Sequence, residues 1–110
     1  MDTPLNGFIN AKITNIQLSK YDCYIETDKG YIVAYNPTKC CKRDVCESLS
    51  DLLLKDIVGQ IIVGVIIKDQ SYLGFELTNN ISIRISLEDK DYEGPEAFEA
   101  WLNTGEIIVN

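Results

Sequence analysis

The side chains that could do chemistry are few, and they form no familiar catalytic set. The chain contains no histidine, the commonest general acid–base group and metal ligand near neutral pH. Its serines lack a G-x-S-x-G environment and a well-placed activating lysine, and its glycines are scattered rather than gathered into a phosphate-binding loop. The inventory therefore favours a binding protein, and we expect no enzymatic activity.

Four cysteines raise the question of a metal or redox site: Cys23, Cys40, Cys41 and Cys46. They lack the paired C-x₂₋₄-C spacing of structural zinc sites, and no histidine is present to complete a set. A CxxC redox motif is also missing. We therefore expect no metal or other cofactor. We expect the cysteines to be reduced thiols, with Cys23 and Cys46 in the core and one of the adjacent pair, Cys40 and Cys41, exposed.

A second metal-like pattern is the run Asp89-x-Asp91-x-Glu93-Gly94, which resembles the opening of a calcium-binding loop. That loop needs a bidentate glutamate at its twelfth position, where this chain has Ala100. Neighbouring surface acids are also far commoner than a glycosidase pair facing across a cleft. We therefore expect neither calcium binding nor carboxylate catalysis here.

The acidic segment from residue 88 to residue 99 is the best functional candidate. It holds six carboxylates and one lysine, interleaved with aromatic residues and followed by Trp101. Acids also suit the start of a helix, and Phe98 and Trp101 could equally anchor the segment to the core. Aromatic residues among charges are nevertheless typical of interface centres. The candidate partner-binding residues are Glu88, Asp89, Asp91, Tyr92, Glu93 and Glu96.

The net charge of −7 bears on the class of partner. Nucleic-acid backbones are bound by clustered lysine and arginine, and this chain has arginine only at positions 43 and 84. We expect no binding to nucleic acid or membranes, and long-range attraction to a basic protein. The N-terminus lacks a signal-peptide pattern, and the longest apolar run, residues 61–67, is too short to span a bilayer. A cytoplasmic location is therefore expected.

The order of strands along the chain predicts two similar three-stranded antiparallel meanders. Alternating apolar residues and turn signals place the strands at residues 8–18, 23–27 and 31–35, and again at 61–67, 73–77 and 81–87. A phase slip near Thr14 indicates a bulge, and the apolar run 61–67 is typical of a central strand. The similarity is compatible with an internal duplication of residues 5–37 and 57–88.

Helices are expected between the meanders and near the end of the chain. Val45, Leu49, Leu52 and Leu53 form one apolar stripe, which predicts an amphipathic helix over about 44–54. Gly94-Pro95 predicts the start of a short helix near 95–102, before a last short strand at 107–109. The length of 110 residues fits a single domain, 1–110, of the α+β class.

Two motif patterns and the general character of the chain resemble known groups of proteins. The run Asp91-Tyr-Glu-Gly-Pro-Glu-Ala97 is similar to a D-Y-x-G-P-E-A segment of small uncharacterised bacterial proteins. Thr27-Asp-Lys-Gly30, Cys40-Cys41 and the segment 52–59 resemble a T-D-K-G…C-C…L-x-G pattern of uncharacterised bacterial and phage-borne proteins. In size, acidity and β-rich plan the chain is also similar to immunity proteins of bacterial toxin systems.

The hypothesis that follows is a non-catalytic, immunity-type inhibitor that covers a basic toxin, such as a nuclease, with its acidic segment. The alternatives are a structural or oligomerisation module that forms a homodimer through an edge strand such as 107–109, and a small-ligand binder or enzyme.

Overall fold

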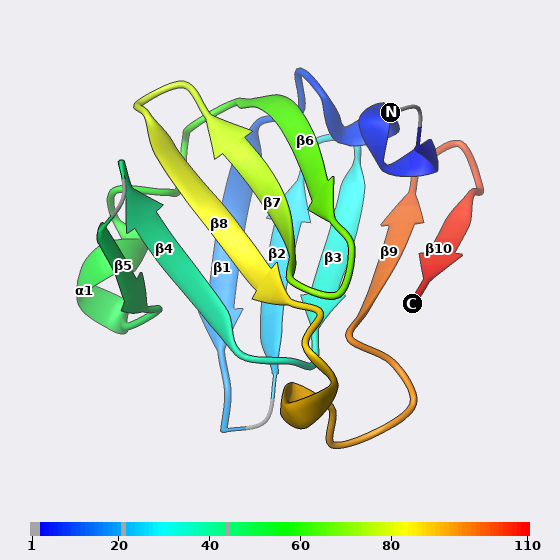
Figure 1. The fold of residues 1–110 in the computed structure, drawn as a ribbon. Coiled ribbons are helices and arrows are strands. Elements are labelled where there is room, and N and C mark those ends of the chain that lie inside the picture. The colour runs from blue at the N-terminus through cyan, green and yellow to red at the C-terminus, as the bar shows by residue number, and fades with distance from the viewer. Residues whose placement is uncertain (1–2, 21, 44) are drawn as a thin grey trace.

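Ten strands in two five-stranded antiparallel sheets make up most of the part of the chain that the computed structural model describes, residues 3–20, 22–43 and 45–110 (Figure 1). The first sheet has the order β1-β2-β3-β9-β10, with β1 Ile13–Leu18, β2 Cys23–Thr27, β3 Gly30–Ala34, β9 Phe98–Leu102 and β10 Ile107–Val109. The second has the order β5-β4-β8-β7-β6, with β5 Val45–Ser48, β4 Thr38–Lys42, β8 Ile81–Ser86, β7 Tyr72–Leu77 and β6 Ile62–Lys68. The helical segments are short: η1 Pro4–Phe8, α1 Asp51–Leu54 and η2 Asp89–Asp91.

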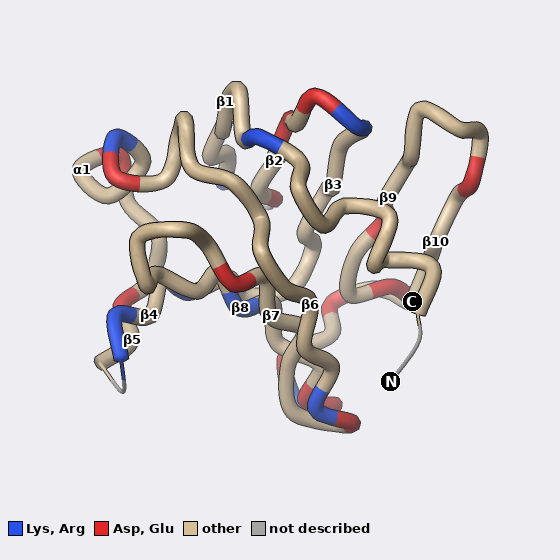
Figure 2. The backbone as a smooth tube through the Cα atoms, turned by 90° about the horizontal axis from the view of Figure 1, so that it is seen from above, with Lys and Arg blue, Asp and Glu red and all other residues tan. Residues whose placement is uncertain are grey.

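The two sheets lie as facing layers, seen edge-on from above in Figure 2. Alternate residues of β2, β3 and β9 point into the space between the layers, as the two-residue period of a strand requires. The apolar core they form draws on both sheets and on η1, and its largest fully buried side chains include Phe8, Phe75, Ile32 and Ile83. At one corner the sheets are joined by a bridge between Lys12 and Ile61.

Both predicted meanders are present, as β1-β2-β3 and β6-β7-β8. The predicted bulge in the first strand is confirmed by a register shift between Ile13 and Asn15, and β6 has a similar shift between Ile62 and Gly64. The last short strand is confirmed as β10. The internal duplication of residues 5–37 and 57–88 stays a prediction.

The α+β class is wrong, because the predicted amphipathic helix over 44–54 does not form. Residues 45–48 are the edge strand β5, and only the four residues of α1 are helical; Asp44 lies outside the described residues. The apolar stripe is not buried, since Val45 is 68% exposed and Leu52 is 79% exposed. Pairing with β4, which sequence spacing does not reveal, satisfies the backbone of this segment instead.

The predicted helix near 95–102 is also wrong, because this segment contains β9. β9 lies between β3 and β10 and pairs with both. Phe98, Ala100 and Leu102 point into the core, while Glu99 and Trp101 point outwards. Two neighbouring strands supply hydrogen-bond partners along both edges, which favours the extended conformation over a short helix that begins at Pro95.

The apolar run at 61–67 predicted a central strand, and this prediction is wrong. β6 is the edge of the second sheet, and Val63, Ile66 and Ile67 are exposed. β4, which the sequence did not predict, lies between β5 and β8 and continues the sheet on the other side.

None of the helices in the described residues is long and apolar enough to cross a membrane.

Candidate functional site

The acidic segment lies at one end of the two sheets, the lower end in Figure 1, where β1, β3 and β8 end and η2 follows. A hollow of about 460 Å³ opens there between the loops that join β1 to β2 and β3 to β4 and the segment around η2. Its lining includes the acids Asp22, Asp91 and Glu93 and the tyrosine Tyr35, together with two lysines, Lys20 and Lys90. The acids of the predicted segment therefore meet a tyrosine and an aspartate from elsewhere in the chain.

Hydrogen bonds between the two sheets fix the position of this hollow. The buried Asn36 donates from Nδ2 to the carbonyl oxygen of Ser86 at 2.8 Å, and Ser86 N–H donates to the carbonyl of Pro37 at 3.0 Å. The Ser86 hydroxyl in turn donates to Asp91 Oδ2 at 2.5 Å. The end of β8 thus holds the loop after β3 on one side and the acidic segment on the other.

The six predicted partner-binding residues do not share one environment. Glu88, Asp89 and Glu93 are exposed, whereas Asp91, Tyr92 and Glu96 are half-buried. Tyr92 packs against the core, and its hydroxyl donates to Asn110 Oδ1 at 3.0 Å. Tyr92 therefore also supports the fold, and its role as an aromatic anchor for a partner stays a prediction. The ion pair between Lys42 and Asp56 includes none of the six residues.

Tyr35, which the sequence analysis did not select, is the aromatic residue among the acids. It is 37% exposed and lines both the large hollow and a neighbouring hollow of about 350 Å³ that includes Glu93 and Glu96. Partial burial raises its pKa, and the charges of Glu99, Glu96 and Asp22 and a hydrogen bond with Glu99 raise it further. The phenol therefore stays protonated at neutral pH and remains a hydrogen-bond donor within an acidic group of side chains.

Glu96 and Glu99 interact with each other next to Tyr35. Partial burial raises the pKa of Glu96, and the charge of Glu99 and a side-chain hydrogen bond with it act in the same direction. We refer to Asp22, Tyr35, Asp91, Glu93, Glu96 and Glu99 as the acidic end. A cationic group that entered it would relieve the repulsion between these carboxylates.

A row of aromatic side chains continues from the acidic end across the outer face of the first sheet. Tyr31 lies 5.5 Å from Tyr24 and 5.9 Å from Trp101 between ring centroids, and the Tyr31 and Trp101 rings are stacked. Tyr31 and Trp101 are paired across β3 and β9, and Glu99 points outwards beside Trp101. Trp101 is thus a surface residue, whereas Phe98 is in the core. We call Tyr24, Tyr31 and Trp101 the aromatic row.

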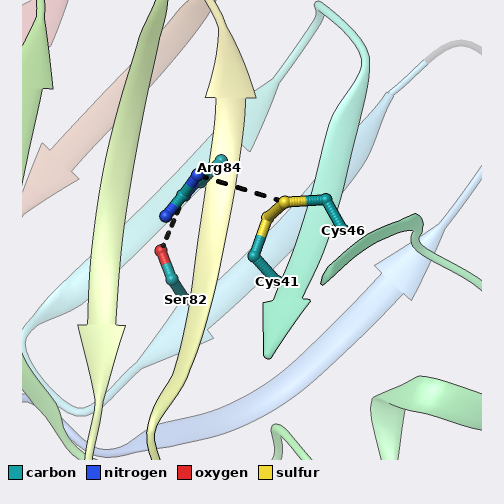
Figure 3. The surroundings of a disulfide bond; sticks show 4 residues. All are labelled: Cys41, Cys46, Ser82 and Arg84. Carbon is teal, nitrogen blue, oxygen red and sulfur yellow. Dashed lines mark hydrogen bonds between the residues drawn. A yellow bond between two sulfur atoms is a disulfide. The ribbon is translucent and has the colours of Figure 1, made fainter. Parts of the chain in front are cut away.

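The prediction for the cysteines is wrong in three respects. Cys41 and Cys46 form a disulfide across β4 and β5, and Cys46 is exposed while both Cys40 and Cys41 are buried (Figure 3). Cys23 and Cys40 are free thiols in the core. Burial, together with the charge of Asp22, raises the pKa of Cys23 to about 11, and burial also raises the pKa of Cys40. These two thiols are therefore poor nucleophiles.

The described residues contain no group of three or more His, Cys, Asp or Glu side chains arranged to hold a metal ion. What the acidic end offers is a set of carboxylate acceptors around one phenol, bordered by partly exposed aromatic rings. Ammonium and guanidinium groups are the natural complement of such a set.

The sequence did contain a signal for Tyr31 and Tyr35, which the sequence analysis did not select. Tyr31 and Tyr35 lie in phase on one alternating strand, so a shared outer face could have been read from the two-residue period. The contact between Tyr31 and Trp101 could not have been predicted from the sequence, because it depends on β9 lying next to β3.

No family model, no curated protein and no solved structure matches this chain.

Proposed function

We propose that this protein is a non-catalytic binding domain that docks a basic protein against the acidic end and the aromatic row. The observation that carries the proposal is the position of Tyr35, which lines two neighbouring hollows together with acids from separate parts of the chain, Asp22, Glu93 and Glu96. Long-range attraction by the net charge of −7 would speed the encounter with a basic partner.

The aromatic row supports the same proposal, because tyrosine and tryptophan contribute most to binding when an interface desolvates them. Trp101 is 37% exposed, and its ring rests against Tyr31. Strand pairing fixes the backbone of both residues and stacking restrains their rings, so little conformational entropy is lost when a partner covers them.

The more specific form of the proposal is an immunity-type inhibitor of a basic toxin, with a nuclease as the leading case, in the cytoplasm. Carboxylates of the acidic end would occupy the lysine and arginine groups with which such a toxin holds substrate phosphates. A pull-down with the product of the adjacent gene tests this form. Retention of a basic protein by the wild type, and its loss in the variant described next, would support it.

Neutralising three carboxylates of the acidic end is expected to weaken binding of a basic probe about tenfold at low salt, because each carboxylate that solvent reaches contributes a few tenths of a kcal/mol to 1 kcal/mol. The variant is Glu93→Gln, Glu96→Gln, Glu99→Gln, and the probe is a peptide of alternating arginine and glycine. Trp101 is the single tryptophan of the chain, so its fluorescence reports binding next to the acidic end.

The matched control removes three exposed carboxylates elsewhere, with the substitutions Glu47→Gln, Asp69→Asn and Glu106→Gln. Both variants change the net charge equally. If the two variants lose affinity equally, binding follows net charge alone and the proposed site is wrong.

Self-association is a second candidate function, favoured by the exposed edge of β6. Val63 is 50% exposed and Ile66 is 41% exposed on this strand. An apolar edge strand offers unpaired backbone groups to a second copy.

Light scattering over a range of protein concentrations tests this candidate. Self-association through β6 predicts a mass that rises towards that of a dimer and returns to that of a monomer in Ile66→Lys, since an edge lysine opposes strand pairing. Ile107→Lys, on β10 at an edge of the first sheet, should leave the dimer intact. A monomer at every concentration would rule the candidate out.

A further inference from the structure

The disulfide between Cys41 and Cys46 lies on the outer face of the second sheet, away from the core (Figure 3). Its two residues are already opposite each other in the β4–β5 hairpin, which is held by four residue pairs. The cross-link spans only five positions of sequence, so it constrains the unfolded chain less than a long-range disulfide would. We therefore expect the hairpin to stay folded when this disulfide is reduced.

The two sulfur atoms differ in access. Cys46 is on the edge strand β5, every residue of which is exposed, whereas Cys41 is 1% exposed. A hollow of about 200 Å³ reaches the disulfide from the outer face of the sheet. Because thiol–disulfide exchange requires an attacking thiolate to reach a sulfur, Cys46 is the sulfur that an external thiol can attack.

Arg84 places a positive charge beside this same sulfur. Its Nη1 lies 4.0 Å from Cys46 Sγ, and its Nε donates to Ser82 Oγ at 3.4 Å. The guanidinium carbon is also 4.5 Å from the centre of the Tyr72 ring. Tyr72 and Ser82 thus hold the guanidinium in place, and an adjacent arginine favours the thiolate form of a cysteine.

The hollow contains other charged groups as well. Lys39 adds a second positive charge, and Glu88 and Asp91 also line the hollow. Arg84 is the charged residue whose hydrogen bond reaches the disulfide among the described residues that line this hollow.

We propose that Cys41–Cys46 is a thiol–disulfide exchange site that accepts electrons from a dithiol reductant through Cys46. A thiolate of the dithiol attacks Cys46 Sγ, the bond to Cys41 breaks, and the electron pair leaves on Cys41 Sγ, which takes up a proton. The second thiol then attacks the reductant's own sulfur in the mixed disulfide, and Cys46 leaves as a thiolate beside Arg84.

The exchange is balanced: two electrons pass to the protein, and the dithiol is released as its disulfide. One of its two protons ends on Cys41 and the other in solvent. In a reducing compartment the bond would be transient, whereas in an oxidising one it would persist. The site does not depend on the binding function proposed for the acidic end.

The test measures the thiol reactivity of the full chain. Protein oxidised with glutathione disulfide is reduced with dithiothreitol, freed of it, and alkylated with iodoacetamide at pH 7, and the modified cysteines are identified by mass spectrometry. We expect Cys46 to be alkylated first and about tenfold more slowly in Arg84→Gln, since one unit of thiol pKa changes the thiolate fraction tenfold. Arg84→Lys, which keeps the charge, should restore much of the rate.

Lys68→Gln is the matched control. The Lys68 ammonium lies 5.8 Å from the centre of the Tyr72 ring, which Arg84 also contacts, and both substitutions remove one positive charge. The alkylation rate of the control should equal that of the wild type, and buried Cys23 and Cys40 should stay unmodified while the protein is folded. The proposal is overturned if glutathione disulfide leaves Cys41 and Cys46 as thiols, if Cys46 reacts no faster than Cys23, or if Arg84→Gln and Lys68→Gln behave alike.

Discussion

Replacing Gly30 with alanine is expected to lower the free energy of unfolding by about 3 kcal/mol or more, a large part of the 5–15 kcal/mol typical of a domain. An added Cβ would lie 2.0 Å from the carbonyl oxygen of Trp101 and 2.9 Å from Cα of Leu102. Both atoms belong to the backbone of β9, so relief requires β3 and β9 to separate. Gly30 also has a φ of +149°, which side-chain-bearing residues rarely adopt.

The local turn adds to the cost of moving Gly30. The buried Thr27 donates from Oγ1 to the Gly30 carbonyl at 2.8 Å and accepts from Lys29 N–H at 3.1 Å. A shift at Gly30 would disturb both hydrogen bonds. Because Trp101 belongs to the aromatic row, the same shift should change its fluorescence in the folded state.

Urea unfolding followed by circular dichroism measures the effect, and Gly94→Ala provides the control. An added Cβ at Gly94 meets nothing within 4 Å, so the change there should stay within about 1 kcal/mol. Equal unfolding midpoints for the two variants would contradict the close contact between β3 and β9.

Truncating Phe75 to alanine is expected to cost about 3–5 kcal/mol, the range observed for buried phenylalanine. Phe75 is in β7, is 1% exposed, and meets Phe8 of η1 edge-to-face with 6.3 Å between ring centroids. The substitution leaves a cavity between the second sheet and η1 and removes the aromatic contact. We expect a much lower urea midpoint and faster amide exchange in η1.

Val63→Ala on the neighbouring edge strand β6 is the comparison for Phe75→Ala. Val63 is half exposed, so its truncation should cost less than about 1 kcal/mol. Should Phe75→Ala prove as stable as Val63→Ala, the two sheets would not enclose a common core in the way described.

Parts of the fold could be predicted because they depend on neighbours in sequence. The alternation in β2, β3, β7 and β8 and the turns at 28–30 and 79–80 combine a two-residue period with turn-forming residues. Such signals determine hairpins without reference to the rest of the chain, and the two meanders were found from them.

The segments predicted as helices failed for a different reason. Val45, Leu49, Leu52 and Leu53 have helical spacing, but residues 45–48 pair with β4, which itself needs β8 as a partner. In the second segment, Phe98, Ala100 and Leu102 alternate as in a strand, but Gly94-Pro95 is typical of the start of a helix. The segment forms a strand because β9 pairs with β3 on one side and β10 on the other. Local propensity is a weak determinant when distant strands compete for the same backbone groups.

The candidate site divides in the same way. The density of carboxylates over 88–99, the lack of histidine and the net charge are properties of composition, so they can be read from the chain without its fold. Folding brings Tyr35 and Asp22 to those acids, packs Tyr92 against the core, and places Arg84 beside Cys46. Each of these pairings joins residues from different strands or loops, and their proximity follows from the order of strands in the two sheets, which no local pattern encodes.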